Sequence, residues 1–337
     1  MTEGHGDDLY RYGGRVIHNF SSNIFARTDH SALMAHLAAC GAQIAAYPEP
    51  EPYTLESEIA SAAGIGSGEV MVTNGATEAV YLVAMMMAGK QAAILAPTFR
   101  EYQDACRLHH VDITFFGDME SMPEADVIWI CNPNNPTGHR IDPNAILYAA
   151  SCLTDTLFVI DQAYADYLTL PLISHKEAVA AGNVVLLSSL TKRFSIPGLR
   201  IGYATGSAGL LDRLRALRMP WSVNALAIEA ARWLLRHRAD YPIDAPALHA
   251  EALRISAALE GVGIKCCHTD CNFLLALLPD RTAAELKEWL VERHALLIRD
   301  ASNFETLTPR HFRVAAQSPE QNEILINALK QWTELSQ

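Results

Sequence analysis

Short apolar runs alternate with longer amphipathic stretches through the first two thirds of the chain. Six runs have the length of buried strands: 92–96, 111–116, 127–131, 157–161, 184–188 and 201–205. Uninterrupted apolar runs are typical of parallel strands covered on both faces, and parallel strands need crossover helices between them. The pattern therefore predicts a mostly parallel sheet enclosed by two layers of helices.

The pattern changes after about residue 219. Two long helices are expected over 224–238 and 245–259, and strands and helices alternate from there to the end. A chain of 337 residues also corresponds to about two domains at roughly 150 residues each. We therefore expect a large domain over 36–220 and a smaller α/β domain over 221–337.

Composition and charge narrow the class of protein. Half of the residues are apolar, which favours a folded globular chain. The 26 basic residues face 38 acidic ones, and the net charge of -12 disfavours nucleic acid and anionic membranes as partners. No apolar run reaches the roughly 18 residues of a membrane span, and the first residues do not resemble a signal peptide. The expectation is a cytoplasmic enzyme that holds any anionic ligand locally.

The seven cysteines lie mostly inside apolar runs, which indicates reduced core thiols. The cluster over 266–271 contains three cysteines, a histidine and an aspartate. It lacks a second ligand pair at zinc spacing and continues directly into an apolar strand, so a structural role is favoured and no metal is expected.

Polar residues gather directly after four apolar runs. In a doubly wound sheet, ligands bind at the carboxyl ends of the strands. The first segment, 73–78, contains Gly75 and Thr77 at a helix start, which is either an ordinary cap or a phosphate seat. The second segment, 132–138, is a rigid turn that combines prolines with asparagines.

The other two segments bring charged groups. Asp161 ends an apolar run, and a buried carboxylate requires a partner there because an unpaired buried charge costs roughly several kcal/mol. The last segment crowds one strand end with Ser189, Thr191, Lys192 and Arg200. Ser-x-x-Lys also marks penicillin-binding proteins and class A β-lactamases, but their partner motifs Ser-Asp-Asn and Lys-Thr-Gly do not occur in the sequence. The glycines at 64–68 precede a strand and so form no dinucleotide fingerprint.

Together the four segments suit pyridoxal 5'-phosphate. They offer a lysine for its aldehyde, a carboxylate for its ring nitrogen, a phenol and an amide for its ring hydroxyl, and a phosphate seat. Their order resembles that of fold-type I enzymes of the class I and II aminotransferase family, with matching motifs at 74–78, 132–138, 161–164, 189–192 and 197–202. The resemblance implies the aspartate aminotransferase-like α/β fold, with an N-terminal arm over 1–35 that joins the small domain.

The resemblance also implies a role for each matching residue. Lys192 would bind the cofactor and shuttle protons, Asp161 would pair with the ring nitrogen, and Tyr164 would contact the ring hydroxyl. Asn135 would share that contact, and Phe99, or alternatively Tyr102, would stack on the ring. The expected phosphate contacts are Gly75, Ala76, Thr77, Ser189, Thr191 and Arg200. Tyr47 resembles the tyrosine that reaches the cofactor of a second subunit, which implies a homodimer with shared active sites.

Substrate recognition is implied by two closer resemblances. Segments 219–227 and 297–304 are similar to threonine-phosphate decarboxylases of cobalamin biosynthesis, and histidinol-phosphate aminotransferases come next. The expected contacts to a substrate carboxylate or phosphate are Arg313, Arg299, Asn23 and His5. Ala46, Gln162 and Gln317 depart from the usual pattern and leave the substrate open.

Two alternatives come from other classes. A transcription regulator normally adds a DNA-binding module, for which the chain has no spare residues. A catalytically silent cofactor-binding protein would be expected to lose Lys192, which is present. The resemblance therefore favours decarboxylation of O-phospho-L-threonine to aminopropanol phosphate over transamination with 2-oxoglutarate.

Overall fold

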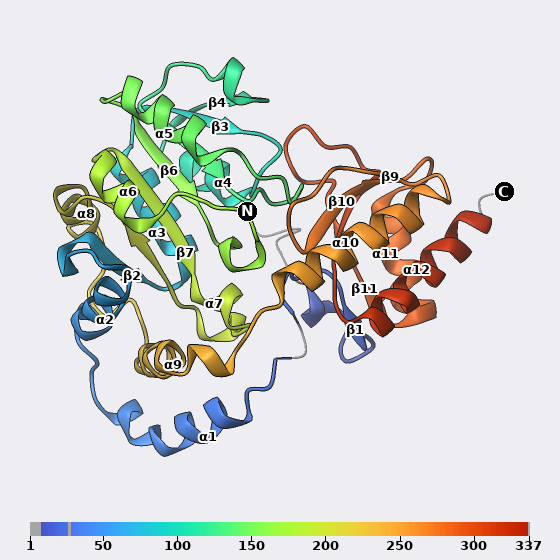
Figure 1. The fold of residues 1–337 in the computed structure, drawn as a ribbon, viewed down its shortest axis with the longest axis horizontal. Helices are drawn as coiled ribbons and strands as arrows, with labels where there is room; N and C mark the ends of the chain where they lie inside the picture. Colours follow the sequence, from blue (N-terminus) through green and yellow to red (C-terminus); the bar gives the residue numbers. More distant parts are fainter. Residues whose placement is uncertain (1–7, 26–27, 336–337) are drawn as a thin grey trace.

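A seven-stranded sheet forms the centre of the large domain in the computed structural model, which describes residues 8–25 and 28–335 (Figure 1). Its order is β2 (Val70–Thr73), β8 (Gly202–Thr205), β7 (Val184–Ser189), β6 (Leu157–Asp161), β5 (Val127–Cys131), β3 (Gln91–Leu95) and β4 (Asp112–Phe116). β8 runs antiparallel to both of its neighbours, and the other pairs are parallel. The predicted, mostly parallel sheet is confirmed.

Two layers of helices cover the sheet. One face packs against α3 (Gly75–Met86), α4 (Glu101–Leu108) and α8 (Ala208–Arg215), and the other against α5 (Pro143–Cys152) and α6 (His175–Ala181). β5 shows why its run is apolar throughout. Val127 and Trp129 belong to the first layer, and Ile128 and Ile130 belong to the second.

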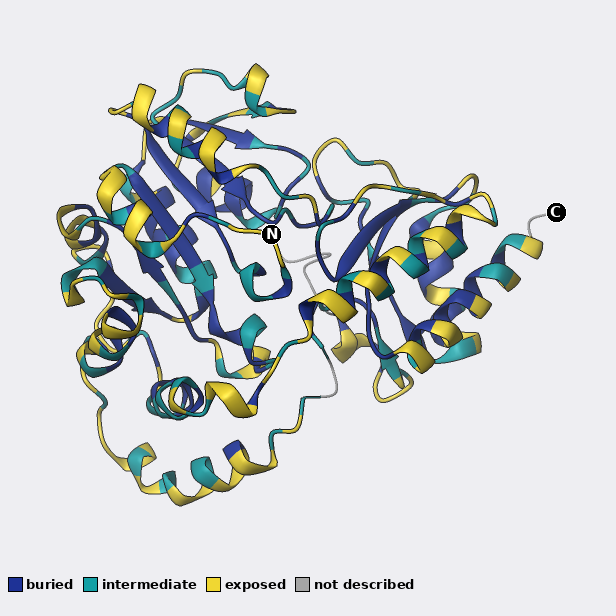
Figure 2. Ribbon diagram, in the orientation of Figure 1, coloured by how far each residue is buried: buried dark blue, intermediate teal, exposed yellow. Residues whose placement is uncertain are grey.

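A third cluster packs α2 (Tyr53–Ala63), α7 (Leu190–Arg193) and α9 (Ala225–Arg236) beside β2. Ala227 and Ile228 of α9 share this cluster with Val70 and Val72. The apolar face of α9 is thus buried beside the large sheet, and the domain boundary at residue 220 stays a prediction. In Figure 1, α1 (Ser31–Ala39) lies at the margin of the molecule, and Figure 2 shows it largely exposed, with Leu33 as its buried residue.

The small domain has a four-stranded sheet in the order β12 (Arg299–Asp300), β13 (His311–Ala315), β10 (Phe273–Leu277) and β9 (Lys265–Cys266). Three helices accompany it: α10 (Ala245–Glu260), α11 (Ala283–His294) and α12 (Pro319–Glu334). β1 (His18–Asn19) pairs in parallel with β11 (Leu296–Leu297), and Phe20 is buried in the core of this domain. Residues 18–20 of the predicted arm thus pack with the small domain, whereas Leu33 packs in the cluster beside β2.

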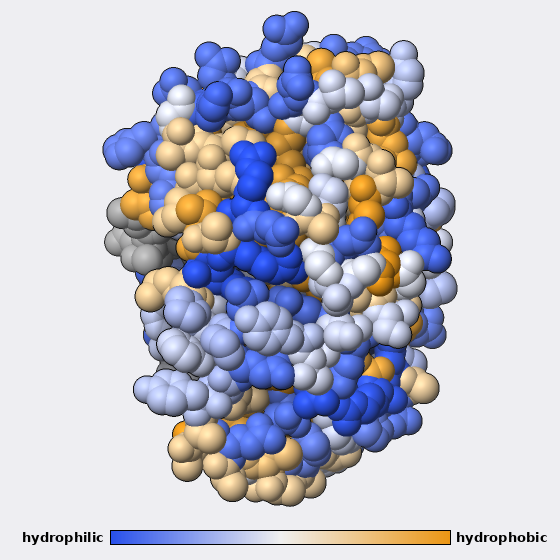
Figure 3. Space-filling model, turned by 90° about the vertical axis from the view of Figure 1, so that its left-hand side faces the viewer, coloured by the Kyte–Doolittle hydropathy of each residue, from blue (hydrophilic) through white to orange (hydrophobic). Residues whose placement is uncertain are grey.

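The face of the large domain that points away from the small domain is mostly hydrophilic, with separate apolar spots (Figure 3). Within residues 8–25 and 28–335, no helix combines the length and the apolar character needed to cross a membrane. All seven cysteines are free thiols. Cys106, Cys131 and Cys271 are buried as expected, but Cys152 and Cys267 are exposed.

Candidate active site

The four polar segments predicted from the sequence meet at one cavity of about 310 Å³. β5, β6 and β7 are parallel neighbours, so their carboxyl ends lie at the same edge of the sheet. The N-terminus of α3 joins them because β8 links β2 to β7. The predicted cofactor residues that line the cavity are Ala76, Thr77, Phe99, Asn135, Asp161, Tyr164, Ser189, Thr191, Lys192 and Arg200.

Asp161 is the last residue of β6 and is buried. Its Oδ1 accepts a hydrogen bond from the Ala163 backbone N–H at 2.9 Å, and its Oδ2 accepts one from the Tyr102 hydroxyl at 2.7 Å. Burial raises the pKa of the carboxyl, while these two bonds and the nearby Lys192 charge oppose the rise. A buried carboxylate at the wall of a cavity suits a positively charged ligand group.

Tyr102 therefore supports Asp161 from behind. Its ring is fully buried and stacks on Trp129, with centroids 5.2 Å apart. Tyr102 is not among the residues that line the cavity, whereas Phe99 is. The alternative of Tyr102 as the stacking ring is wrong for this reason, and Phe99 stays the candidate.

Lys192 lies on the single turn of α7 that follows β7. Its Nζ donates a hydrogen bond to the Ser22 carbonyl at 3.3 Å and lies 5.6 Å from the centroid of the Tyr164 ring. Tyr164 is buried and packs edge to face on Phe273, and burial raises the pKa of its phenol. The lysine amine and the phenol thus occupy the same side of the cavity.

Two glycines, Gly75 and Gly202, allow the chain to form the expected phosphate-binding site. Gly75 has φ +73°, and a Cβ there would come within 2.8 Å of Nη2 of Arg200. A Cβ at Gly202 would meet the Ala76 backbone nitrogen at 2.6 Å, so β8 passes directly beneath the start of α3. Ser189 Oγ and Thr191 Oγ1 lie 2.7 Å apart and also line the cavity. Helix N–H groups, hydroxyls and a guanidinium are the donors that a phosphate requires.

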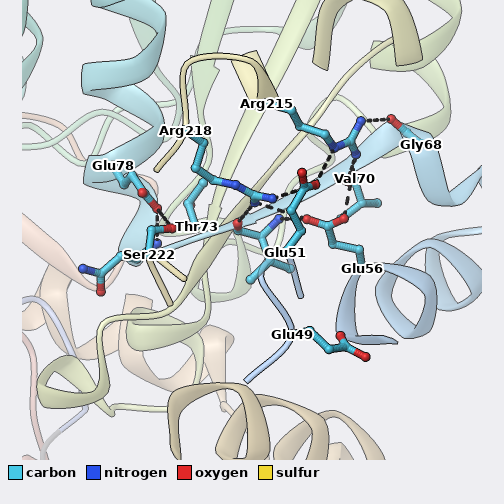
Figure 4. Close-up of polar contacts among 12 residues, drawn as sticks. Glu49, Glu51, Glu56, Gly68, Val70, Thr73, Glu78, Arg215, Arg218 and Ser222 are labelled. Carbon is cyan, nitrogen blue, oxygen red and sulfur yellow. Dashed lines mark hydrogen bonds and ion pairs between the residues drawn. The ribbon is translucent and has the colours of Figure 1, made fainter. Parts of the chain in front are cut away.

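Charged side chains brace the edge strand that leads into this seat (Figure 4). Glu56 accepts a hydrogen bond from the Val72 N–H at 2.9 Å, and Arg218 donates one to the Val72 carbonyl at 2.7 Å. Glu78 accepts hydrogen bonds from the Asn74 N–H at 2.6 Å and from the Ser222 hydroxyl at 3.2 Å. This bracing occupies backbone groups on the open edge of β2 and fixes the turn into α3. The sequence carries no signal for it.

Two buried arginines line the small-domain side of the cavity. Arg299 of β12 and Arg313 of β13 are paired in register. Arg313 donates to the Asn135 side chain and to the Ser21 carbonyl, and Arg299 donates to the Asn303 side chain at 2.8 Å. The predicted anion-binding residues therefore lie together, opposite the lysine-bearing edge of the sheet.

Arg100 is a cavity residue that the sequence reasoning missed. Burial lowers the pKa of Arg299, and the positive charge of Arg100 lowers it further, so the two guanidinium groups repel each other across the cavity. Nε of Arg100 lies 3.3 Å from Oδ2 of Asp104, an ion pair that holds the arginine at the start of α4. Its position directly after Phe99 is the one sequence feature that could have indicated it.

Two predicted residues, Asn23 and Tyr47, lie outside the lining of the cavity, and a third is not among the described residues. Asn23 is fully buried and lies beside the Tyr164 hydroxyl, outside the set that lines the cavity. Tyr47 is 86% exposed, with its ring 5.4 Å from that of Trp221, so it does not reach the cavity of its own chain. His5 lies outside the described residues.

The residues present fit the cofactor implied by the resemblance. The buried Asp161 carboxylate suits a protonated ring nitrogen, and the cradle formed by Gly75 and Arg200 suits a phosphate. Lys192 lines the same cavity.

Comparison with known proteins agrees with this geometry. A family described as "Aminotransferase class I and II" matches residues 16–329. The threonine-phosphate decarboxylase of Salmonella typhimurium is 30% identical over 306 residues, covering 84% of this chain and 82% of that protein. Histidinol-phosphate aminotransferase 1 of Burkholderia lata is 30% identical over 305 residues, covering 84% and 83%. The solved L-threonine-O-3-phosphate decarboxylase from Porphyromonas gingivalis has a TM-score of 0.90 and 35% identity, covering 94% and 100%.

Proposed function

Because the chain belongs to the class I and II aminotransferase family, we propose that it decarboxylates O-phospho-L-threonine to aminopropanol phosphate. The protein is an enzyme that depends on pyridoxal 5'-phosphate. The proposed substrate is O-phospho-L-threonine, and the bond broken joins its Cα to its carboxylate. Its support is the pair of similar threonine-phosphate decarboxylases and the charge of the cavity.

The cavity charge is the observation that carries the proposal. Arg100, Arg299 and Arg313 line it in addition to Arg200 at the phosphate seat. An amino acid with both a carboxylate and a phosphate brings the two anionic groups that these guanidinium groups match. A substrate with a single carboxylate would offer these guanidinium groups one anionic partner instead of two.

The bound cofactor supplies an electron sink that makes bonds at the substrate Cα labile. Asp161 would keep a proton on the ring nitrogen of the cofactor. Lys192 would hold the cofactor through Nζ and would afterwards deliver a proton from Nζ to the substrate Cα. Tyr164 and Asn135 orient its ring hydroxyl, and Asn135 is itself oriented by Arg313. When the carboxylate leaves as carbon dioxide, this proton takes its place.

The arginines decide which bond breaks. A guanidinium binds both carboxylate and phosphate, so the anion held by Arg313 would set the orientation of the substrate Cα in the cavity. For decarboxylation, Arg299 and Arg313 would hold the substrate phosphate, so that the carboxylate is the group left to depart.

The direct test is mass spectrometry after O-phospho-L-threonine is incubated with the cofactor-loaded enzyme without a keto acid. The expected product is aminopropanol phosphate, and Lys192→Ala should abolish its formation. An untouched substrate would refute the proposal. The second candidate, an aminotransferase, is favoured by the similar Burkholderia enzyme. It would instead form glutamate from histidinol phosphate and 2-oxoglutarate.

The proposal includes a homodimer with shared active sites. Tyr47 and Trp221 present an exposed aromatic pair, and Met34 on the exposed α1 is 62% exposed. A partner that covers this surface would bring Tyr47 to its own cofactor phosphate. Sedimentation should show a dimer for the wild-type protein and a weaker dimer for Trp221→Ala. A monomeric wild-type enzyme would refute the proposed homodimer.

The same resemblance also supports the proposal that the enzyme is cytoplasmic and acts in cobalamin biosynthesis.

A further inference from the structure

His139 of the large domain lies beside His268 and Asp270, which belong to the segment over 266–271. His268 and Asp270 precede β10 of the small domain, and His139 follows the turn at the end of β5 in the large domain. The sequence alone does not indicate that His139 joins His268 and Asp270, because it lies more than a hundred residues before them. The fold brings the three side chains together outside the active-site cavity.

The spacing of the ligand atoms is that of a metal site. His139 Nδ1 lies 3.4 Å from Oδ2 of Asp270, and His268 Nε2 lies 3.0 Å from Oδ1. The three residues offer ligand atoms that all lie within 4.8 Å of one another. A tetrahedral ion with bonds of about 2.0–2.1 Å places its ligands roughly 3.4 Å apart. Small side-chain movements would therefore complete the coordination.

The carboxylate is already held in place. Its Oδ2 accepts a hydrogen bond from the Arg140 N–H at 2.8 Å, and the Asp270 N–H donates to the Gly138 carbonyl at 3.0 Å. The two chain segments touch so closely that a Cβ at Gly138 would lie 2.6 Å from the Phe273 carbonyl. Hydrogen bonds of this kind orient metal ligands. Both histidine side chains are exposed, at 58% and 70%, so an ion could enter and keep water ligands.

We propose that His139, His268 and Asp270 bind a divalent transition-metal ion of the zinc class. Two imidazoles and a carboxylate favour zinc, nickel or copper over magnesium or calcium, which prefer oxygen ligands. The ion ties the two domains together next to the active site. The turn that carries Asn135 leads into His139, and β10 is paired with β13, which carries Arg313. Occupation of the site therefore holds the contact between Asn135 and Arg313 in place. This inference does not depend on the proposed substrate.

A second group among the described residues provides a matched control. His36 and Cys40 lie four positions apart with Nε2 and Sγ 3.6 Å apart, and Glu229 Oε2 lies 3.8 Å from His36. Arg232 also lies 3.4 Å from the Glu229 carboxylate and competes with a cation there. The group that spans the domains has no such competing arginine side chain in its ion pairs.

The experiment is isothermal titration of zinc chloride into tag-free, cofactor-loaded protein freed of excess cofactor. One ion per chain should bind, and thermal unfolding should shift to higher temperature. His139→Gln and His268→Gln should each weaken binding by about tenfold or more and remove the shift. His36→Gln and Cys267→Ser should leave both unchanged.

Each opposite result overturns the proposal. Absence of zinc binding does so directly, as does unchanged binding in the double variant His139→Gln/His268→Gln. Loss of binding in His36→Gln or Cys267→Ser places the ion elsewhere. Circular dichroism of the variants checks that they fold, which is expected because both histidines are exposed.

Discussion

Tyr102 donates a hydrogen bond from its hydroxyl to Oδ2 of Asp161, with an Oη to Oδ2 distance of 2.7 Å, and both residues are buried. The bond joins α4 to the end of β6 beneath the cavity. It leaves the carboxylate ionisable in a place where burial alone would favour the neutral acid.

Asp161→Asn should stabilise the cofactor-free protein at neutral pH while abolishing activity. Because burial raises the pKa of Asp161, its contribution to stability is full below the unfolded value and is lost as pH rises through the folded value. At pH 7 the ionised carboxylate therefore costs free energy, on the order of 1 kcal/mol per pKa unit. Tyr102 can rotate its hydroxyl to accept from the amide.

Urea titration of the cofactor-free proteins at about pH 5 and about pH 8 checks this prediction. The gain from Asp161→Asn should be larger at the higher pH. A variant that is less stable than the wild type at about pH 8 would contradict the assignment of a raised pKa.

Arg100→Ala should raise KM for O-phospho-L-threonine more than it lowers kcat. A charge-assisted hydrogen bond contributes roughly 1.5–3 kcal/mol, so kcat/KM should fall by about 10 to 100-fold. Arg100→Lys should retain part of the effect because it keeps the charge without the planar fork. Steady-state kinetics with L-threonine provide the control. Arg100 faces Arg299 of the pair proposed to hold the phosphate, so it should matter little for a substrate that has no phosphate. Equal losses with both substrates would refute this role.

Arg218→Met should lower the free energy of unfolding by about 3 kcal/mol, because the Val72 carbonyl loses its donor and Glu56 keeps only the longer ion pair with Arg215 at 3.9 Å. The matched control is Arg238→Met. Arg238 forms an ion pair with Asp166 at 2.7 Å but is 60% exposed, so its loss should cost less than about 1 kcal/mol. Urea denaturation compares the two, and equal losses would mean that the network along β2 adds no stability.

Gly202→Ala should weaken cofactor binding more than it lowers thermal stability. Its Cβ would meet backbone atoms of Ala76 and Ser188 at 2.6 and 2.7 Å, so the phosphate seat must shift. Gly209→Ala is the control, because a Cβ at Gly209 meets no atom within 4 Å and alanine favours the helix there. Titration of the cofactor-free proteins with pyridoxal 5'-phosphate, followed by absorbance, measures the difference. Unchanged affinity in Gly202→Ala would show that the close approach is not required.

Local signals in the sequence determined the large sheet and one wall of the site. Strand-length apolar runs predicted β3 to β8 because strands buried on both faces need no polar alternation. Asp161 and Lys192 could be selected because they directly follow such runs, and parallel strands place their carboxyl ends together. These inferences depend on order along the chain, which a sequence states directly.

Only the tertiary structure decided which distant groups meet. It packed the apolar face of α9 into the cluster beside β2. It placed Tyr102 behind Asp161, Arg100 across from Arg299, and His139 beside Asp270. In each case the two groups come from segments far apart along the chain, and no repeating pattern in the sequence indicates that they meet. Packing of the helices and of the two domains sets their distance, and therefore their chemistry.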